Sequence, residues 1–258
     1  MKINKLNEDK KNGKLSFLLK DSTSAFINTV RRLIMEEVPT LAVEDIEVKD
    51  NNSALYDELL GLRIGLVPIK TDLKSYVLKE NCKCEGAGCA QCELKVNLKV
   101  TKKGMVLAED AESSDPKCKF VYPNMPIVKL LAKQKVDLLM TAVMGKGKDH
   151  VKWSPGLVFY KREPVIEIGK VKDSVKVAER CPKNVFSAKG DKLAIIKENL
   201  YGCHLCGQCT DLDENITIGE SNNFIFNLES WGQLSCKEIL DTSAGILIAK
   251  VEAMESLI

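Results

Sequence analysis

One group of four cysteines constrains this 258-residue chain more than any other feature. Cys181 is followed by proline, and Cys203, Cys206 and Cys209 follow later in the run CHLCGQC. A C-x2-C-x2-C loop together with one remote Cys-Pro is a ligand spacing typical of iron–sulfur clusters. The spacing predicts that these four cysteines hold one [4Fe–4S] cluster. The [3Fe–4S] form, with one iron fewer, stays open, and a zinc ion bound by the same four thiolates is the alternative.

The residues around this group indicate a ferredoxin-like lobe with a single cluster. Val185, Phe186 and the strand-like residues 193–196 lie where such a lobe has its core. A two-cluster ferredoxin would continue the second run as C-x3-C-P, but Asp213 and Glu214 stand at those places. The positions of an upstream triple run hold Val171, Ser174 and Val177. A lone cluster suits a structural or sensory role at least as well as electron transfer.

A second group of four cysteines occupies the run NCKCEGAGCAQC. Its glycines permit the positive φ angles that a short loop needs to bring its sulfur atoms together. The spacing predicts a structural Zn2+ that adds folding free energy and is bound by Cys82, Cys84, Cys89 and Cys92. Two disulfides or an unmetallated loop are the alternatives. The polar N-terminus does not resemble a signal peptide, and reduced thiols in the cytosol would disfavour disulfides.

Composition and charge exclude several classes of function. No apolar run is long enough to span a membrane, and a hydrophobic content of 45% supports real cores in two or three modules. A net charge of +2 does not demand nucleic acid, and 5% aromatic residues argue against a base-stacking surface. The two histidines, His150 and His204, join no catalytic triad, and the GKGK run lacks the frame of a phosphate-binding loop. The sequence therefore contains no recognisable active site.

The first fifty residues predict a strand, a helix and a second strand. Residues 15–20 alternate weakly, and Asp21-Ser22 is a helix start. The helix is expected to end at Pro39, and residues 41–48 alternate as a strand does.

Cys118 and Cys236 belong to neither group of four cysteines, and core or surface roles are expected for both.

The C-terminal region predicts a hairpin and a long helix. Residues 216–219 and 224–228 flank SerAsnAsn221–223, which indicates a turn between two strands. Ser235 and Glu238 form a capping box that begins the helix. One side of this helix carries Leu240, Leu247, Val251, Met254 and Ile258. Such a stripe serves as intrachain core in part, and its exposed remainder predicts a partner subunit.

Several ordered blocks resemble one protein family. They are TSAFINTVRRL (residues 23–33), EEVPTLAVEDIEV (36–48), LRIGLVPI (62–69) and GKGKDHVKWSP (145–155). Asn28, Arg31 and Arg32 match the family's helix motif. Over essentially its full length, the chain resembles the D-subunit family of archaeal DNA-directed RNA polymerases. That family is related to the third-largest eukaryotic subunit and to the N-terminal domain of the bacterial alpha subunit.

The resemblance implies an α+β fold in three parts. These are a discontinuous alpha-like dimerisation domain (1–38 and 214–258), an inserted platform domain with the zinc-type loop (39–165) and a ferredoxin-like iron–sulfur lobe (166–213). The residues expected at the partner surface are Phe26, Val30, Arg31, Leu33, Ile34, Leu240, Leu247, Val251 and Met254. His150 is expected to touch a partner or to cap a loop, and His204 to face solvent.

The implied function is that of a cytoplasmic, non-catalytic scaffold in a nucleotidyltransferase complex. The chain would pair with the small subunit L, and the two large catalytic subunits, which hold the catalytic Mg2+, would dock on the pair. DNA and RNA would be met only through the complex. A ferredoxin-like electron-transfer or redox-sensing protein is the alternative, in which the cluster itself is the function.

Overall fold

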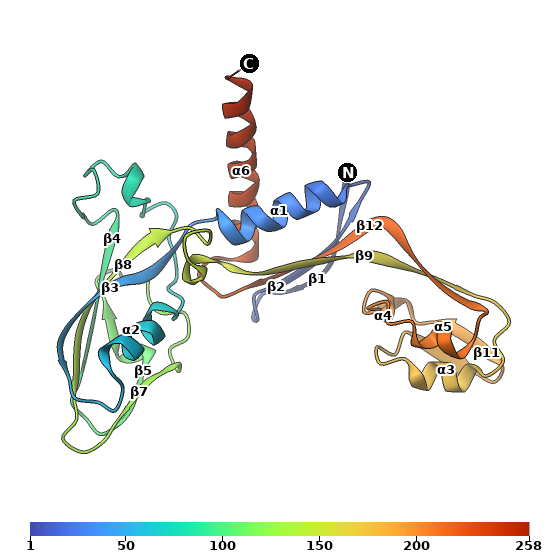
Figure 1. The fold of residues 1–258 in the computed structure, drawn as a ribbon, viewed down its shortest axis with the longest axis horizontal. Helices are drawn as coiled ribbons and strands as arrows, with labels where there is room; N and C mark the ends of the chain where they lie inside the picture. The colour runs from blue at the N-terminus through green and yellow to red at the C-terminus, as the bar shows by residue number, and fades with distance from the viewer. Residues whose placement is uncertain (258) are drawn as a thin grey trace. The chain divides into compact units, whose positions relative to one another are not determined.

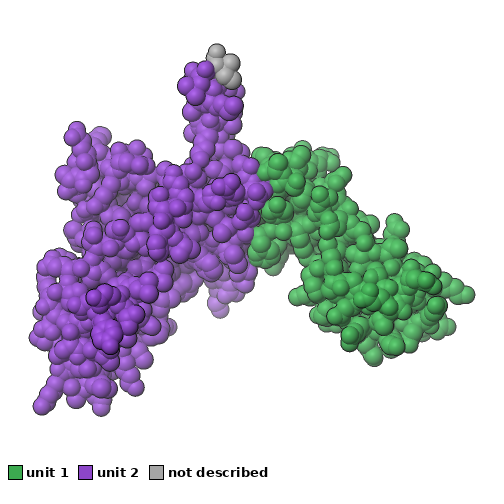
Figure 2. Space-filling model, viewed as in Figure 1, with its two compact units in different colours: residues 1–8, 16–27, 159–227 green, residues 9–15, 28–158, 228–258 purple. Residues whose placement is uncertain are grey.

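The computed structural model describes residues 1–257 and divides into two compact units (Figure 2). Unit 1 comprises Met1–Glu8, Ser16–Ile27 and Phe159–Asn227, and unit 2 comprises Asp9–Leu15, Asn28–Val158 and Leu228–Ile258. Ile258, which the sequence analysis placed on the apolar stripe, lies outside the described residues. None of the helices within residues 1–257 combines the length and apolar character needed to cross a bilayer.

Unit 2 is built on an antiparallel sheet with the strand order β3-β8-β4-β6 (Figure 1). Its strands are β3 (Thr40–Asn51), β4 (Glu93–Val100), β6 (Ala111–Ser113) and β8 (Val136–Gly145). A two-stranded sheet, helix α2 and three short 3-10 helices complete this part: β5 (Gly104–Leu107), β7 (Pro126–Leu130), α2 (Asp57–Gly65), η1 (Lys79–Asn81), η2 (Ala108–Asp110) and η3 (Val151–Trp153). The strand predicted at 41–48 is confirmed as the central part of β3.

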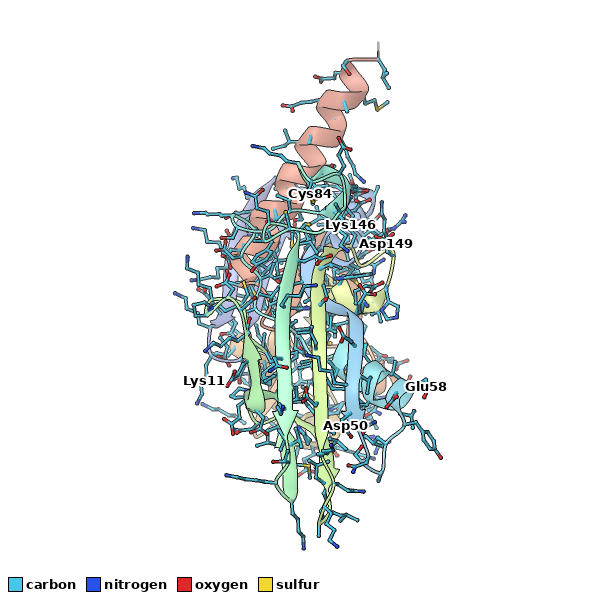
Figure 3. The ribbon with its side chains drawn as sticks, turned by 90° about the vertical axis from the view of Figure 1, so that its left-hand side faces the viewer. Lys11, Asp50, Glu58, Cys84, Lys146 and Asp149 are labelled. Atoms are coloured by element: carbon cyan, nitrogen blue, oxygen red, sulfur yellow. The ribbon has the colours of Figure 1, made fainter. Side chains whose placement is uncertain are left out.

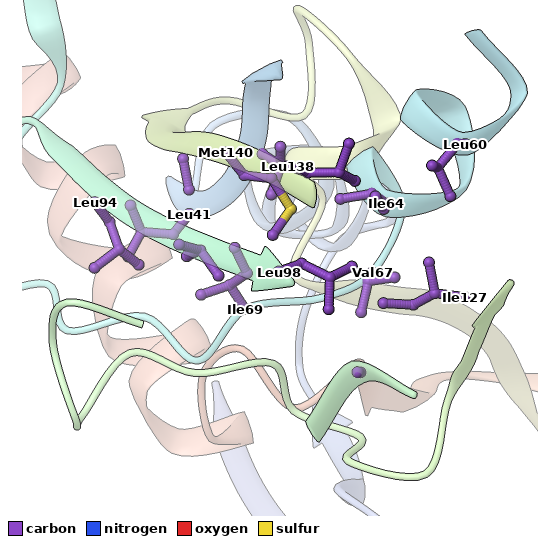
Figure 4. Packing of buried hydrophobic residues seen from close by; sticks show 14 of the residues in the cluster. Leu41, Leu60, Ile64, Val67, Ile69, Leu94, Leu98, Ile127, Leu138 and Met140 are labelled. Carbon is purple, nitrogen blue, oxygen red and sulfur yellow. The ribbon is translucent and has the colours of Figure 1, made fainter. Parts of the chain in front are cut away.

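The core of unit 2 follows from strand alternation. In β4, Leu94, Val96 and Leu98 are buried, while the lysines and the asparagine between them point outward. Figure 4 shows Leu94 and Leu98 packed in one cluster with Leu138 of β8 and Ile64 of α2. Burying each such side chain contributes about 1.5–3 kcal/mol, so this cluster is what stabilises the sheet on its covered face.

The two longest helices, α1 and α6, were both predicted. Helix α1 (Ser24–Glu36) begins two residues later than the sequence suggested, because Thr23 is its cap: the Phe26 N–H donates to Thr23 Oγ1 at 3.2 Å. Helix α6 (Cys236–Glu255) has the predicted capping box. The Glu238 N–H donates to Ser235 Oγ at 3.2 Å, and the Ser235 N–H donates to Glu238 Oε2 at 2.8 Å.

A second four-stranded sheet has the order β1-β2-β12-β9. Its strands are β1 (Lys2–Asp9), β2 (Lys14–Lys20), β9 (Gly156–Ile168) and β12 (Ile216–Ser230). β2 confirms the strand expected at 15–20. Phe17 of β2 stacks on Phe226 of β12, with ring centroids 5.0 Å apart. β1 was not anticipated, because its sequence is largely polar and it lies at the edge of the sheet.

The hairpin predicted at 216–228 is wrong, because β12 runs through residues 221–223 as one continuous strand. The polar residues of the expected turn are bonded to the neighbouring strand instead. Ser221 Oγ and Asn223 Nδ2 donate to Glu163 Oε2 of β9 at 3.1 and 2.7 Å. A cross-strand carboxylate thus satisfies side chains that would otherwise favour a turn.

The rest of unit 1 is a small lobe inserted between β9 and β12. Its elements are α3 (Ser174–Arg180), β10 (Phe186–Lys189), β11 (Lys192–Ile195), α4 (Lys197–Leu200) and α5 (Gln208–Leu212). The strand expected at 193–196 is confirmed as β11, which pairs with β10. Val185 and Phe186 are buried in the lobe's core, as predicted. Two of the four cysteines predicted to hold the cluster, Cys203 and Cys209, are buried in the same core.

Candidate metal centres and partner surface

The first candidate centre is the loop between η1 and β4. Glu85, Gly86 and Gly88 adopt positive φ angles of 52°, 83° and 93°, which fold the loop back on itself. The sulfur atoms of Cys82, Cys84, Cys89 and Cys92 all lie within 4.8 Å of one another. All ten cysteines are among residues 1–257, and no disulfide joins any two of them. These four can therefore hold a metal ion, and the disulfide alternative is wrong.

The thiols of this loop affect one another's ionisation. The hydrogen bond between Cys84 and Cys82 lowers the pKa of Cys84 to about 6, whereas burial raises the pKa of Cys92 to about 12. The Cys89 N–H also donates to Cys92 Sγ at 3.2 Å, which stabilises negative charge on that sulfur. One thiolate therefore forms readily, and a bound cation would favour loss of the remaining protons.

Ion pairs fix the loop to unit 2. Glu93, the first residue of β4, pairs with Lys79 at 2.9 Å and with Lys95 at 3.0 Å. Lys146 Nζ lies 3.7 Å from Glu80 and 4.0 Å from Glu37, whose carboxylate also accepts a hydrogen bond from Lys250 of α6 at 2.8 Å. Figure 3 shows Cys84 and Lys146 at the same end of the sheet of β3, β8 and β4. These charges link the loop to the end of α1 and to α6.

The second candidate centre lies in the lobe of unit 1, where one pocket is lined by all four predicted ligands. Cys181 is the C-cap of α3, and the other three, Cys203, Cys206 and Cys209, come from the loop before α5 and from its first turn. Leu205 and Gly207, with φ angles of 59° and 77°, turn the chain between the ligands. The remote Cys181 thus lines the same pocket as the cysteines of the CHLCGQC run.

The sulfurs of this second set are more widely spaced than those of the first. Among residues 1–257, only the loop of Cys82–Cys92 has three or more candidate ligand atoms within 4.8 Å of one another. Cys203 and Cys209 are buried, Cys181 is half-buried and Cys206 is exposed. The Val185 N–H donates to Cys181 Sγ at 3.4 Å, and burial raises the pKa of Cys209. One corner of the pocket, at Cys206, is therefore open to solvent.

Two residues that the sequence analysis did not assign hold this lobe together. Lys161 of β9 donates to the backbone carbonyl oxygens of Tyr201 and Cys203 at 2.6 and 2.7 Å. The buried carboxylate of Asp213 accepts hydrogen bonds from the Lys172 N–H at 2.7 Å and from the Asn215 N–H at 3.0 Å. No local sequence pattern identifies either residue, because their partners are backbone groups. Most of these groups lie about forty residues away in the chain.

The histidines have modest roles. The Lys152 N–H donates to His150 Nδ1 at 3.1 Å, so His150 caps η3, as one of its two expected roles requires. His204 lies at the pocket of the second cysteine set and is exposed, in agreement with the expectation that it faces solvent. Cys118 is fully buried in the core of unit 2.

The residues expected at a partner surface differ in exposure. Leu33 and Ile34 of α1 are 6% and 0% exposed, so their side chains are occupied within this chain. Val30, Arg31, Leu240 and Leu247 are half-buried. Phe26 is 37% exposed, and on the last turns of α6 Val251 and Met254 are 49% and 65% exposed, with Ile248 at 58%. The terminal half of α6 therefore presents an uncovered apolar face.

Comparison with known proteins agrees with these features. Residues 46–157 match the RNA polymerase Rpb3/RpoA insert domain family. The chain is 36% identical over 247 residues to the DNA-directed RNA polymerase subunit Rpo3 of Methanosarcina acetivorans, covering 94% of this chain and 93% of the relative. It is 34% identical over 254 residues to Rpo3 of Archaeoglobus fulgidus (97% and 96% covered), and 32% identical over 251 residues to Rpo3 of Pyrococcus furiosus (95% and 92% covered). Near-complete coverage at this identity shows that the chain belongs to the archaeal Rpo3 family of DNA-directed RNA polymerase subunits.

Proposed function

We propose that this chain is a non-catalytic assembly subunit of DNA-directed RNA polymerase, which pairs with the small subunit L before the large catalytic subunits dock. The observation that carries the proposal is the exposed apolar face of α6. Ile248, Val251 and Met254 recur at intervals of three residues and are about half to two-thirds exposed. A helix that leaves this much apolar surface in water is stabilised when a partner covers it.

The test is pulldown of the tagged chain with the small subunit. Val251→Glu should weaken pairing at least about 100-fold, because association would bury an ionised carboxylate. Lys237→Glu introduces the same side chain at an exposed position near the other end of α6 and serves as the control. Equal binding by wild type and both variants would contradict an interface on the terminal half of α6.

For the loop of Cys82, Cys84, Cys89 and Cys92, the proposed metal is a structural Zn2+. Tetrahedral zinc with Zn–S bonds of about 2.3 Å requires sulfur separations of about 3.8 Å. Four separations in the loop lie between 3.4 and 3.8 Å. This agreement supports a single ion held by four thiolates, with no position left for a substrate or water. A structural site of this kind adds folding free energy and no chemistry.

For Cys181, Cys203, Cys206 and Cys209, the proposed cofactor is one [4Fe–4S] cluster. The wider spacing of these sulfurs, the ferredoxin-type ligand order and the N–H bond to Cys181 Sγ support it. The role proposed for the cluster is to hold the lobe in its folded form, since two ligands lie within the lobe's core. Such a cluster could supply one-electron chemistry, but the assembly function does not use it.

Replacing Cys206 distinguishes this structural role from electron transfer. Cys206 is the exposed ligand, so serine there removes a cluster corner without opening the core. A structural cluster predicts a less protected lobe and poor docking of the large subunits, with pairing to the small subunit retained. Intact assembly of Cys206→Ser together with loss of electron transfer would favour the redox alternative.

A further inference from the structure

We propose that Lys161 is a positioning residue of the cluster site: it holds the CHLCGQC loop in its ligating conformation and favours the reduced cofactor. This inference rests on the proposed iron–sulfur cluster. Lys161 lies on β9, outside the lobe's own helices and strands and outside the cysteine motif. Its side chain nevertheless reaches the segment that carries the first cysteine of the triple run.

The contacts are short and involve backbone carbonyls only. Lys161 Nζ donates to Tyr201 O at 2.6 Å and to Cys203 O at 2.7 Å. Hydrogen bonds from a charged donor at such distances are stronger than neutral ones. Because the two carbonyls belong to residues on either side of Gly202, one ammonium group fixes the direction in which the chain enters the ligand loop.

Within residues 1–257, Lys161 is the only hydrogen-bond donor to the carbonyl oxygens of Tyr201 and Cys203. The amides of the same segment are used in local turns: the Gly202 N–H donates to Asn199 O at 2.9 Å, and the Cys203 N–H donates to Leu200 O at 3.0 Å. The carbonyls point to Lys161 instead. Without the ammonium, two half-buried acceptors would lose their partner, and the loop would have to rotate to recover hydrogen bonds from water.

The charge of Lys161 is not neutralised by a carboxylate. Within residues 1–257, none of the ion pairs includes Lys161. The other cation that acts on it is Lys183. One-electron reduction makes a cluster with its four thiolates more negative by one charge. A fixed, partly desolvated cation beside one ligand stabilises that state, as outer residues do at metal centres.

Three variants of the full chain, purified without oxygen, test this role. Lys161→Met removes the charge and both hydrogen bonds but keeps the length of the side chain, and Lys161→Arg keeps the charge. Lys197→Met is the matched control, because Lys197 is an exposed lysine of the same lobe. The readouts are iron content, the rate of iron loss to a chelator, and the midpoint potential in a titration with dithionite as reductant.

Lys161→Met is expected to lose iron about tenfold faster than wild type and to favour the reduced state about tenfold less, which lowers the midpoint potential by about 59 mV. Lys161→Arg should restore most of the potential, and Lys197→Met should match wild type. If Lys161→Met takes up no iron while Lys161→Arg does, the positioning role is supported.

Wild-type retention and potential in Lys161→Met would overturn the inference about Lys161 alone. A wild-type chain that binds zinc or no metal at these four cysteines would overturn the cluster proposal, and the inference with it. The two failures are therefore distinguishable in one set of preparations.

Discussion

Replacing Gly147 with alanine is expected to destabilise unit 2 strongly. Gly147 belongs to the GKGK run that follows β8, and this run packs on the last turn of α1. A Cβ atom at Gly147 would overlap the carbonyl oxygen of Met35 and would lie 3.0 Å from its carbonyl carbon and 3.4 Å from Glu36 Cα. All three are backbone atoms of a helix, so no side chain can rotate away to make room.

The expected loss is about 3 kcal/mol. Overpacking against a fixed neighbour costs about 1–3 kcal/mol. The Lys148 N–H donates to Glu36 O at 3.0 Å, and moving the loop away would remove this bond at about 1 kcal/mol. For a folded unit of this size, about 3 kcal/mol corresponds to a fall in Tm of about 6–12 °C.

Tryptophan fluorescence can measure this loss, because both tryptophans, Trp153 and Trp231, belong to unit 2. Trp153 is 9% exposed and its ring lies against Gly145, so its emission reports unfolding at the site of the change. Gly245→Ala is the control: nothing lies within 4 Å of its added Cβ, and alanine within a helix should stabilise by about 0.5–1 kcal/mol. A Gly147→Ala variant within about 0.5 kcal/mol of wild type would refute this reasoning.

Three further predictions concern metal, pH and the lobe. Chelation at neutral pH should remove one zinc per chain and speed amide exchange in η1 and at the start of β4. Cys92→Ser should have the same two effects. Cys118→Ser, which lies outside the loop, should retain the metal. The hydrogen bond from Lys250 lowers the pKa of Glu37 in the folded protein. The stability that this bond contributes is therefore present above the pKa of an unfolded glutamate, about 4.3, and is lost as the pH falls through the lower pKa of the folded state. Lys250→Met should therefore lower stability by under about 1 kcal/mol at pH 7 in urea titrations, and a deficit that persists at pH 3 would contradict this. Asp213→Ala should destabilise the lobe, seen as faster exchange of the Lys172 and Asn215 amides, while Glu214→Ala at the exposed neighbouring position should change little.

The elements that were predicted correctly are those whose signals are local. Ser235 and Glu238 are three residues apart, and their mutual bonds depend only on the helix that they begin. Residues 46–49 alternate in burial as a strand with one covered face does, whereas Thr40–Val43 are buried on both faces. The Cys82–Cys92 loop closes within a few turns, so spacing alone was enough to bring its sulfurs together.

The parts that the sequence could not supply depend on residues far apart in the chain. The turn expected at SerAsnAsn221–223 was a reasonable local interpretation, but Glu163 on another strand satisfies these side chains in an extended conformation. The burial of Leu33 and Ile34 likewise depends on what covers α1, which helical periodicity cannot reveal. Lys161 was missed because its acceptors are backbone carbonyls about forty residues away, and backbone carries no sequence signal.

The lack of cysteines for a second cluster also has a physical explanation in the lobe. Val177, at a position where an upstream triple run would need a cysteine, is 2% exposed in the core, and Ser174 Oγ donates to Gly190 O at 2.5 Å. Asp213, where the following Cys-Pro would begin, accepts backbone hydrogen bonds on both carboxylate oxygens. On that side of the lobe, apolar packing and a hydrogen-bonded carboxylate thus stabilise the fold where a second cofactor would otherwise do so. On the other side Cys181 is remote from the triple run, so the four cysteines of the proposed cluster meet only if the core around Val185 forms. We therefore expect binding of that cofactor and folding of the lobe to be one equilibrium.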